Sequence, residues 1–136
     1  MLLGLRSVIY PAPDLAAAKA ATATLLGAEP YFDEPFYVGF SAGGYELGLD
    51  PNLDPASGPV TYWGVADIEM AVIDLASKNA TPQTAVQDVG GGIRTVTLHV
   101  PALGLVGLIQ NPHYDAMTAV PEAAATAETV EPSTAP

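Results

Sequence analysis

The sequence has no cysteine and only four basic residues, and each shortage excludes a class of function. Without cysteine the chain cannot form a disulfide, a thiolate nucleophile or a cysteine–zinc site. Four Lys and Arg residues against fifteen Asp and Glu residues give a net charge of −11. Such a chain has few cations to neutralise phosphates, so we expect it to bind neither nucleic acid nor an anionic membrane.

Long hydrophobic runs are also missing. No apolar stretch approaches the roughly 18–20 residues that a membrane-spanning helix needs, and the first residues lack a charged region and a cleavage site typical of a signal peptide. The chain is nevertheless 49% hydrophobic and only 14% charged over 136 residues, which is enough to build a core. We therefore expect a cytoplasmic protein with one folded domain.

The last 22 residues, 115–136, differ in composition from the rest of the chain. They contain Ala, Thr, Pro and four acids, but no basic or aromatic residue. Such a segment buries too little apolar area to offset the entropy of ordering it. We predict a folded domain over 1–114 and a flexible acidic tail over 115–136.

The predicted domain consists of two similar halves, 1–50 and 60–114, joined by a polar linker over 51–59. Each half reads as one strand, one helix and three further strands. The strands are expected at residues 3–10, 31–33, 37–41, 45–49, 61–65, 84–88, 93–100 and 105–110. The predicted class is therefore α+β, with the same βαβββ order twice.

Each predicted helix has recognisable ends. Asp14 and Asp67 precede the helices, and a carboxylate there accepts the free amide protons of the first turn. Gly27 and Asn79 follow the two predicted helices. Both residue types tolerate the left-handed conformation that often ends a helix. The inner stripes are predicted to be Leu15, Ala18, Thr22, Leu25 and Leu26 in the first helix and Ile68, Ala71, Val72 and Leu75 in the second.

Five short stretches carry a family resemblance: Val8–Leu15, Leu25–Ala28, Tyr45–Leu47, Gly64–Glu69 and Gly107–Pro112. In this order, within a duplicated βαβββ pattern, they make the chain resemble the vicinal oxygen chelate superfamily, which includes glyoxalase I, bleomycin-resistance proteins, fosfomycin-resistance enzymes and extradiol dioxygenases. The resemblance implies two tandem units that form a curled, cup-shaped sheet around one ligand site. It also implies a homodimer.

The metalloenzymes of that superfamily place their ligands at positions that correspond here to Ser7, Glu46, Val60 and Gly107. Only Glu46 offers a charged donor, whereas a catalytic divalent metal generally takes about three protein ligands. His99 and His113 stand outside these positions. We expect His99 to be a strand residue that is exposed or bonded to the backbone, and His113 to be a surface residue. We therefore expect no metal and no other cofactor.

Strand alternation sorts the side chains of the predicted cup. We expect Leu5 to face the cup and Arg6 and Trp63 to face the helices, with Trp63 in the core. Tyr37 and Phe40 are assigned to the cup without a fixed hairpin register, and glycines on this face are expected to leave room for a ligand. The predicted ligand-binding residues are Ser7, Ile9, Tyr37, Glu46, Val60, Tyr62, Gly107 and Ile109.

Three functions remain open at this point. The first is metal-free binding of a small organic molecule, with the acidic charge favouring neutral or cationic ligands. The second is a glyoxalase-like lyase or isomerase in which Glu46 is the catalytic general base. The third is a non-catalytic dimeric module that binds a protein through the apolar final hairpin at Leu103. The alternative to a functional role for Glu46 is that it is an inward-facing acid solvated in an open cup.

Overall fold

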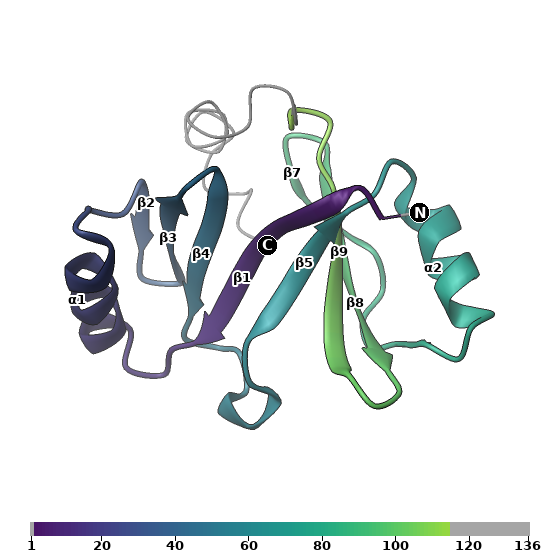
Figure 1. The fold of residues 1–136 in the computed structure, drawn as a ribbon, viewed down its shortest axis with the longest axis horizontal. Helices are drawn as coiled ribbons and strands as arrows, with labels where there is room; N and C mark the ends of the chain where they lie inside the picture. The colour runs from purple at the N-terminus through teal and green to yellow at the C-terminus, as the bar shows by residue number, and fades with distance from the viewer. Residues whose placement is uncertain (1, 115–136) are drawn as a thin grey trace.

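The computed structural model describes residues 2–114, and the tail predicted for 115–136 lies outside them. Figure 1 shows two helices at opposite ends of a curled sheet, and their side chains pack on its outer face. The elements are β1 (Gly4–Pro11), α1 (Leu15–Leu26), β2 (Phe32–Glu34), β3 (Tyr37–Ala42), β4 (Tyr45–Asp50), the 3-10 turn η1 (Pro55–Ser57), β5 (Val60–Gly64), α2 (Ile68–Ala76), β6 (Thr81–Pro82), β7 (Gln87–Gly90), β8 (Ile93–Val100) and β9 (Gly104–Gln110).

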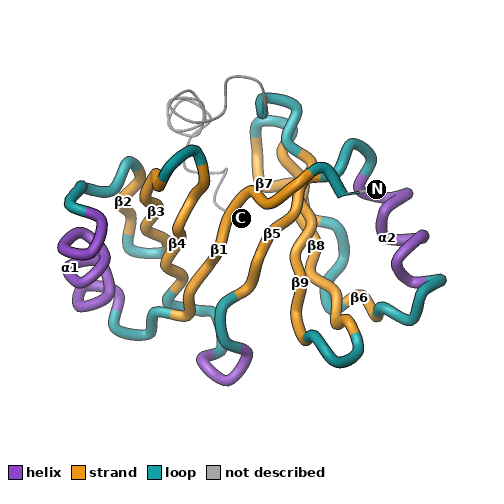
Figure 2. Tube along the Cα trace, in the orientation of Figure 1, coloured by secondary structure: helices purple, strands orange, loops and turns teal. Residues whose placement is uncertain are grey.

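All nine described strands belong to one sheet, in the order β2-β3-β4-β1-β5-β9-β8-β6, with β7 also paired to β8 (Figure 2). The first strands of the two halves, β1 and β5, pair antiparallel at the centre. Each of them pairs parallel with the last strand of its own half, β4 or β9. The predicted α+β fold of two tandem units in a curled sheet is confirmed.

The predicted helix ends are also confirmed. The carboxylates of Asp14 and Asp67 each accept a backbone N–H bond at 3.1 Å from the residue three positions ahead. Gly27 and Asn79 adopt the left-handed conformation, with φ of 65° and 75°. The second helix ends at Ala76, slightly before the predicted end near Lys78. No described helix is long and apolar enough to cross a membrane.

Each half has its own hydrophobic cluster between its helix and the outer face of the sheet. Trp63 packs against the second cluster, as predicted, and its indole N–H donates to the Thr61 hydroxyl at 3.0 Å. The prediction for Leu25 is wrong, because this side chain is 77% exposed. Leu25 and Leu26 lie about 100° apart around the helix, so only one of them can face the sheet. Leu26 does.

The strand predicted over 84–88 differs in the structure. In place of a strand over 84–88, the structure has the two-residue β6 and then β7, which begins at Gln87. Pro82 has no N–H to continue the ladder. The Thr84 hydroxyl then accepts the N–H of Thr97 at 3.2 Å, so a side chain takes the place of a backbone partner.

Candidate functional site

Strand pairing brings the predicted site residues onto one face of the sheet, opposite the helices, which we call the cup face. Ser7 on β1 lies opposite Glu46 on β4 and Tyr62 on β5. Tyr62 in turn lies opposite Gly107 on β9. The same pairings and the strand alternation place Ile9, Tyr37, Val60 and Ile109 on this face.

The prediction that Phe40 faces the cup is wrong. Phe40 is fully buried against α1, in the hydrophobic cluster of the first half. Its strand neighbour Gly39 pairs with Gly48 on the cup face, and Tyr37, two residues before Gly39, lies on the same side. The hairpin register therefore assigns Tyr37 to the cup and Phe40 to the core.

The predicted directions of Leu5 and Arg6 are reversed by a β-bulge. Leu5 pairs with Trp63 and Ser7 pairs with Tyr62, so Arg6 is an extra residue in the ladder. The extra residue shifts the alternation, and Leu5 takes the side of Trp63. The guanidinium of Arg6 lies over the backbone of Gly64, 2.7 Å from the position that a Cβ would take there.

Glu46 is the centre of a polar group on the cup face that we call the acid–tyrosine cluster: Ser7, Tyr31, Tyr37 and Glu46. The Tyr31 hydroxyl donates a hydrogen bond to the Glu46 carboxylate. The hydroxyls of Ser7 and Tyr37 are buried and have no hydrogen-bond partner in the structure. Both residues are only 2% exposed, whereas Glu46 and Tyr31 are partly buried.

Tyr31 is the member of this cluster that sequence reasoning missed. It precedes β2, and its backbone N–H donates to the carbonyl of Gly39 at 3.0 Å, which fixes the segment beside β3. The only signal in the sequence was a predicted strand beginning at residue 31. That prediction could not state which face the ring takes, because the first residue of a short strand has no established alternation.

Burial and hydrogen bonding act in opposite directions on Glu46. Burial raises its pKa to about 7, although the side-chain interactions with the Tyr31 and Tyr37 hydroxyls lower it. Burial, followed by the negative charge of Glu46, raises the pKa of Tyr31 and of Tyr37. Burial and then the charge of Asp50 raise the pKa of Tyr62 to about 12. All three tyrosines thus keep their hydroxyl protons at neutral pH, while Glu46 changes charge there.

The glycines of the cup face do not leave empty space, contrary to the prediction. The Tyr37 hydroxyl takes up the position of a Cβ at Gly48, and the Tyr62 ring takes up that position at Gly107. At Gly39 the corresponding position lies 2.8 Å from the Glu46 carboxylate and 3.1 Å from the Tyr31 ring. The glycines therefore let tyrosine side chains lie close against the sheet and form an aromatic floor.

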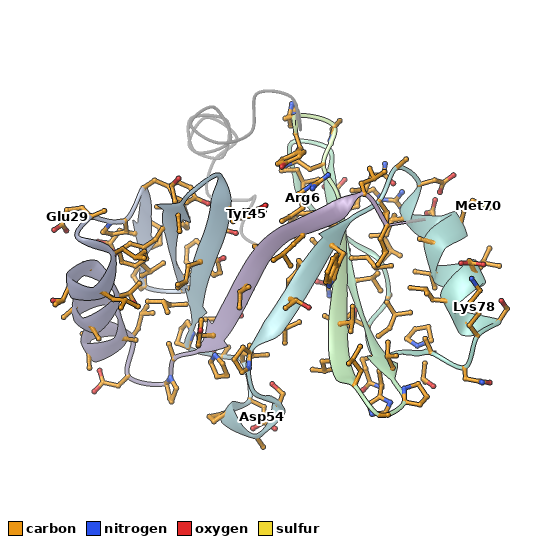
Figure 3. All side chains as sticks on the ribbon, in the orientation of Figure 1. Arg6, Glu29, Tyr45, Asp54, Met70 and Lys78 are labelled. Carbon is orange, nitrogen blue, oxygen red and sulfur yellow. The ribbon has the colours of Figure 1, made fainter. Side chains whose placement is uncertain are left out.

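Glu46 has no basic partner among residues 2–114. Arg6, labelled in Figure 3, lies near the start of β1. Its guanidinium is close to Gly64 on β5 and 3.6 Å from the centre of the Tyr114 ring. The remaining basic residues each pair with an acid outside the cluster: Lys19 with Asp33 at 2.5 Å, Lys78 with Asp74 at 3.3 Å, and Arg94 with Glu69. The cluster is consequently an acid among tyrosine rings.

The two histidines lie on the surface, as predicted. His99 is exposed on β8, and His113 is exposed with its ring Nε2 2.7 Å from the Gly91 carbonyl oxygen. Within the described part of the chain, no group of three His, Asp or Glu side chains is arranged to hold a metal ion.

Comparison with known proteins identifies the fold. The sequence matches no protein family model and no curated protein. Its structure is similar to that of a glyoxalase/bleomycin resistance protein/dioxygenase superfamily member from Vibrio splendidus 12B01, with a TM-score of 0.60 and 20% identity over 78% of this chain and 97% of that one. The chain has the glyoxalase/bleomycin-resistance fold.

Two further solved structures with this fold differ in their chemistry. A methylmalonyl-CoA epimerase variant from Streptomyces coelicolor, in complex with 2-nitronate-propionyl-CoA, has a TM-score of 0.65 and 17% identity over 85% of this chain and 99% of that one. An NAD-dependent benzaldehyde dehydrogenase from Legionella pneumophila has a TM-score of 0.61 and 18% identity over 77% and 97% of the two chains. At these identities the likeness concerns the fold alone.

The positions expected for metal ligands can now be compared with the residues that this chain has there. The four positions that the resemblance assigned to metal ligands, Ser7, Glu46, Val60 and Gly107, all lie on the cup face. Glu46 is the only one of them with a charged donor. The neighbours of Glu46 on this face supply tyrosine hydroxyls instead of the imidazoles and carboxylates that a divalent metal prefers.

Proposed function

We propose that this protein binds a small organic molecule on the cup face without a metal, and that the acid–tyrosine cluster contacts the ligand. The observation that carries the proposal is the partly buried Glu46 side chain beside two buried hydroxyls that have no hydrogen-bond partner among residues 2–114. A buried carboxylate without a basic partner costs free energy, and so does each unsatisfied hydroxyl. A ligand with polar groups would satisfy all three together.

The same chemistry disfavours a metal at this position. One carboxylate and neutral hydroxyls are fewer strong donors than a catalytic divalent ion requires. The ligand class that fits the negative charge of the chain is neutral or cationic, because an anion would be repelled. A homodimer is proposed together with this function, following the resemblance to the superfamily.

Native mass spectrometry of the protein purified from its source tests the proposal directly, because one spectrum reports ligand, metal and subunit number. We expect a small organic adduct and no stoichiometric metal. Incubation with Ni²⁺ or Zn²⁺ before buffer exchange should leave well under one equivalent of metal per chain. A stoichiometric ion that is lost in Glu46→Gln would contradict the proposal.

A second function, catalysis by Glu46 as a general base, is favoured by one observation. Its pKa of about 7 lies where a base can both accept and release a proton at neutral pH. A lyase or isomerase would use it to remove a proton next to a carbonyl group. Proton NMR of hydroxyacetone in D₂O tests this function: exchange at carbon that is faster with the wild type than with Glu46→Gln supports it, and equal rates contradict it.

A further inference from the structure

The acid–tyrosine cluster presents oxygen atoms that need hydrogen-bond donors. The hydroxyls of Ser7 and Tyr37 have no partner, and only one of the two Glu46 carboxylate oxygens, Oε2, accepts a hydrogen bond from the described residues. Ser7 lies directly opposite Glu46 across the parallel β1–β4 pair. The Tyr37 hydroxyl lies against Gly48, which is two residues after Glu46 on β4. Two hydroxyl oxygens and one carboxylate oxygen on neighbouring strands of the cup face therefore accept no hydrogen bond from the described residues.

The immediate surroundings of these oxygens are aromatic, and the described cation on the cup face, the Arg6 guanidinium, lies over Gly64 on β5. The Tyr31 side chain lies over Gly39, the Tyr37 side chain over Gly48 and the Tyr62 ring over Gly107. Aromatic faces attract cations through their negative electrostatic potential, and a carboxylate among them adds to that attraction. No described Lys or Arg side chain lies within 4.0 Å of Glu46 to neutralise it.

We propose that the ligand of the cup carries a primary ammonium group, R–NH₃⁺, which donates hydrogen bonds to Glu46, Ser7 and Tyr37. This inference rests on the proposed binding function and names its ligand class. A primary ammonium has three N–H donors and no acceptor, which matches three oxygens in number and in polarity. Its charge takes the place of a basic side chain, which the described residues do not place beside Glu46.

The pattern disfavours three other ligand classes. A quaternary ammonium would interact with the rings but has no N–H to satisfy the hydroxyls. A carboxylate or phosphate would meet the charge of Glu46. A neutral alcohol would supply one donor and leave the charge of Glu46 unpaired. Each class can be represented by a compound with one phenyl ring, so that the aromatic part of the probe stays constant.

The test is an NMR titration of the full-length protein with benzylammonium, benzyltrimethylammonium, benzyl alcohol and benzoate at pH 8 and at pH 5.5. At pH 8, where Glu46 is ionised, we expect benzylammonium to bind at least about tenfold more tightly than the other three, the ratio expected of a charge-assisted hydrogen bond. At pH 5.5, where Glu46 is protonated, this preference should fall to less than about threefold. The shifts should centre on Tyr31 and Tyr62.

Variants separate contact from overall charge. Glu46→Gln should lose the preference for benzylammonium at pH 8, while Glu29→Gln, which removes one charge outside the cluster, should keep it. Tyr37→Phe should weaken benzylammonium several-fold and leave benzyl alcohol nearly unchanged. The other charged or ionisable groups on the cup face are Tyr31, Tyr37, Tyr62, Asp50 beside Tyr62, Arg6 over Gly64, and the exposed His99 farther along. A pH effect that persists in Glu46→Gln would come from these groups and would contradict the inference.

The outcomes distinguish this inference from the proposed function. Equal affinity for the three non-anionic probes, with shifts in the cup, would overturn the ammonium assignment and leave the binding function intact. Tightest binding of benzyltrimethylammonium or of benzoate would do the same. If no probe shifts a cup resonance at either pH, both the ligand class and the binding site are wrong. The pH comparison on the wild type keeps the test decisive even where a variant fails to fold.

Discussion

The ionisation of Glu46 links the chemistry of the cup to the stability of the fold. Its pKa is about 7 in the folded chain against an ordinary value of 4.5, so the folded state holds the proton more tightly than the unfolded state. The resulting stabilisation is complete below pH 4.5 and is lost as the pH rises through 7. We predict that Glu46→Gln, which cannot ionise, is more stable than the wild type at pH 8 by about 1–3 kcal/mol and about equally stable at pH 4.

Urea unfolding at the two pH values measures this difference. Glu29→Gln serves as the control, because it removes the same charge from an exposed position and should show no comparable gain between pH 4 and pH 8. A loss of stability in Glu46→Gln at pH 8, with unchanged ligand affinity, would mean that Glu46 is a structural partner of the tyrosines and that the site is placed wrongly.

Tyr31, which precedes β2, influences the pKa of Glu46. Its hydroxyl stabilises the charged carboxylate and thereby lowers the pKa of Glu46. We predict that Tyr31→Phe raises the pKa of Glu46 above its wild-type value, since burial then acts without this hydrogen bond. A pH titration of the Glu46 side-chain carboxyl carbon by NMR measures the change. An unchanged or lower pKa in Tyr31→Phe would show that the hydrogen bond does not form in solution.

At the scale of helices and strands, local signals were predictable and long-range ones were not. Asp14 and Gly27 end their helix through contacts within a few residues, and the sequence alone was sufficient to assign them. The bulge at Arg6 depends on how β1 aligns with β5, about 55 residues away along the chain, and strand alternation assumed an unbroken ladder. Tyr31 was missed for a similar reason, because its position depends on pairing with β3.

The glycines beneath the aromatic floor explain another difference between prediction and structure. A glycine in a strand permits either an empty pocket or the close approach of another side chain, and sequence alone cannot decide between the two. Here the tyrosine side chains take the space. The aromatic character of the cup therefore depends on glycines as much as on tyrosines.

The close contact of Gly48 with the Tyr37 hydroxyl yields a prediction for strand β4. A Cβ at position 48 would overlap the buried Tyr37 hydroxyl and approach Ile9, so we predict that Gly48→Ala lowers the free energy of unfolding by about 1–3 kcal/mol, the usual cost of overpacking. Chemical denaturation measures the loss. In a Tyr37→Phe background, where the nearest atom is removed, the same substitution should cost less. Equal cost in the two backgrounds would contradict the contact.

At the scale of the whole molecule, the open sheet and its exposed apolar residues favour association. The edge strands β2 and β6 have three and two residues, and Leu103 at the β8–β9 turn is 74% exposed. We predict a symmetric homodimer at micromolar concentration, because large exposed apolar side chains mark interfaces. Light scattering should report about twice the 13.9 kDa of the chain. A single 13.9 kDa species would contradict the dimer.

A variant at the final hairpin locates the interface. Leu103→Ser should weaken the dimer if this hairpin forms the contact, whereas the equally exposed Leu25→Ser on α1 is the matched control. If Leu103→Ser leaves the dimer intact but abolishes capture of a cellular protein, the hairpin serves a protein-binding role instead. Dissociation in both variants alike would point to a general effect of surface polarity and not to a defined interface.

The composition of residues 115–136 predicts that they contribute little to the stability of the folded domain. Both hydrophobic clusters consist of residues within 2–114, and residues 115–136 contain no aromatic side chain that could add a large buried surface. We predict that truncation after Tyr114 changes the free energy of unfolding by less than about 1 kcal/mol.

Tyr114 itself must remain, because its ring lies under the Arg6 guanidinium at the cup. Truncation after Asn111, which removes that ring, is the comparison: it should lower the melting temperature more than the first truncation does. A large drop already on truncation after Tyr114 would show that the segment packs against the folded domain.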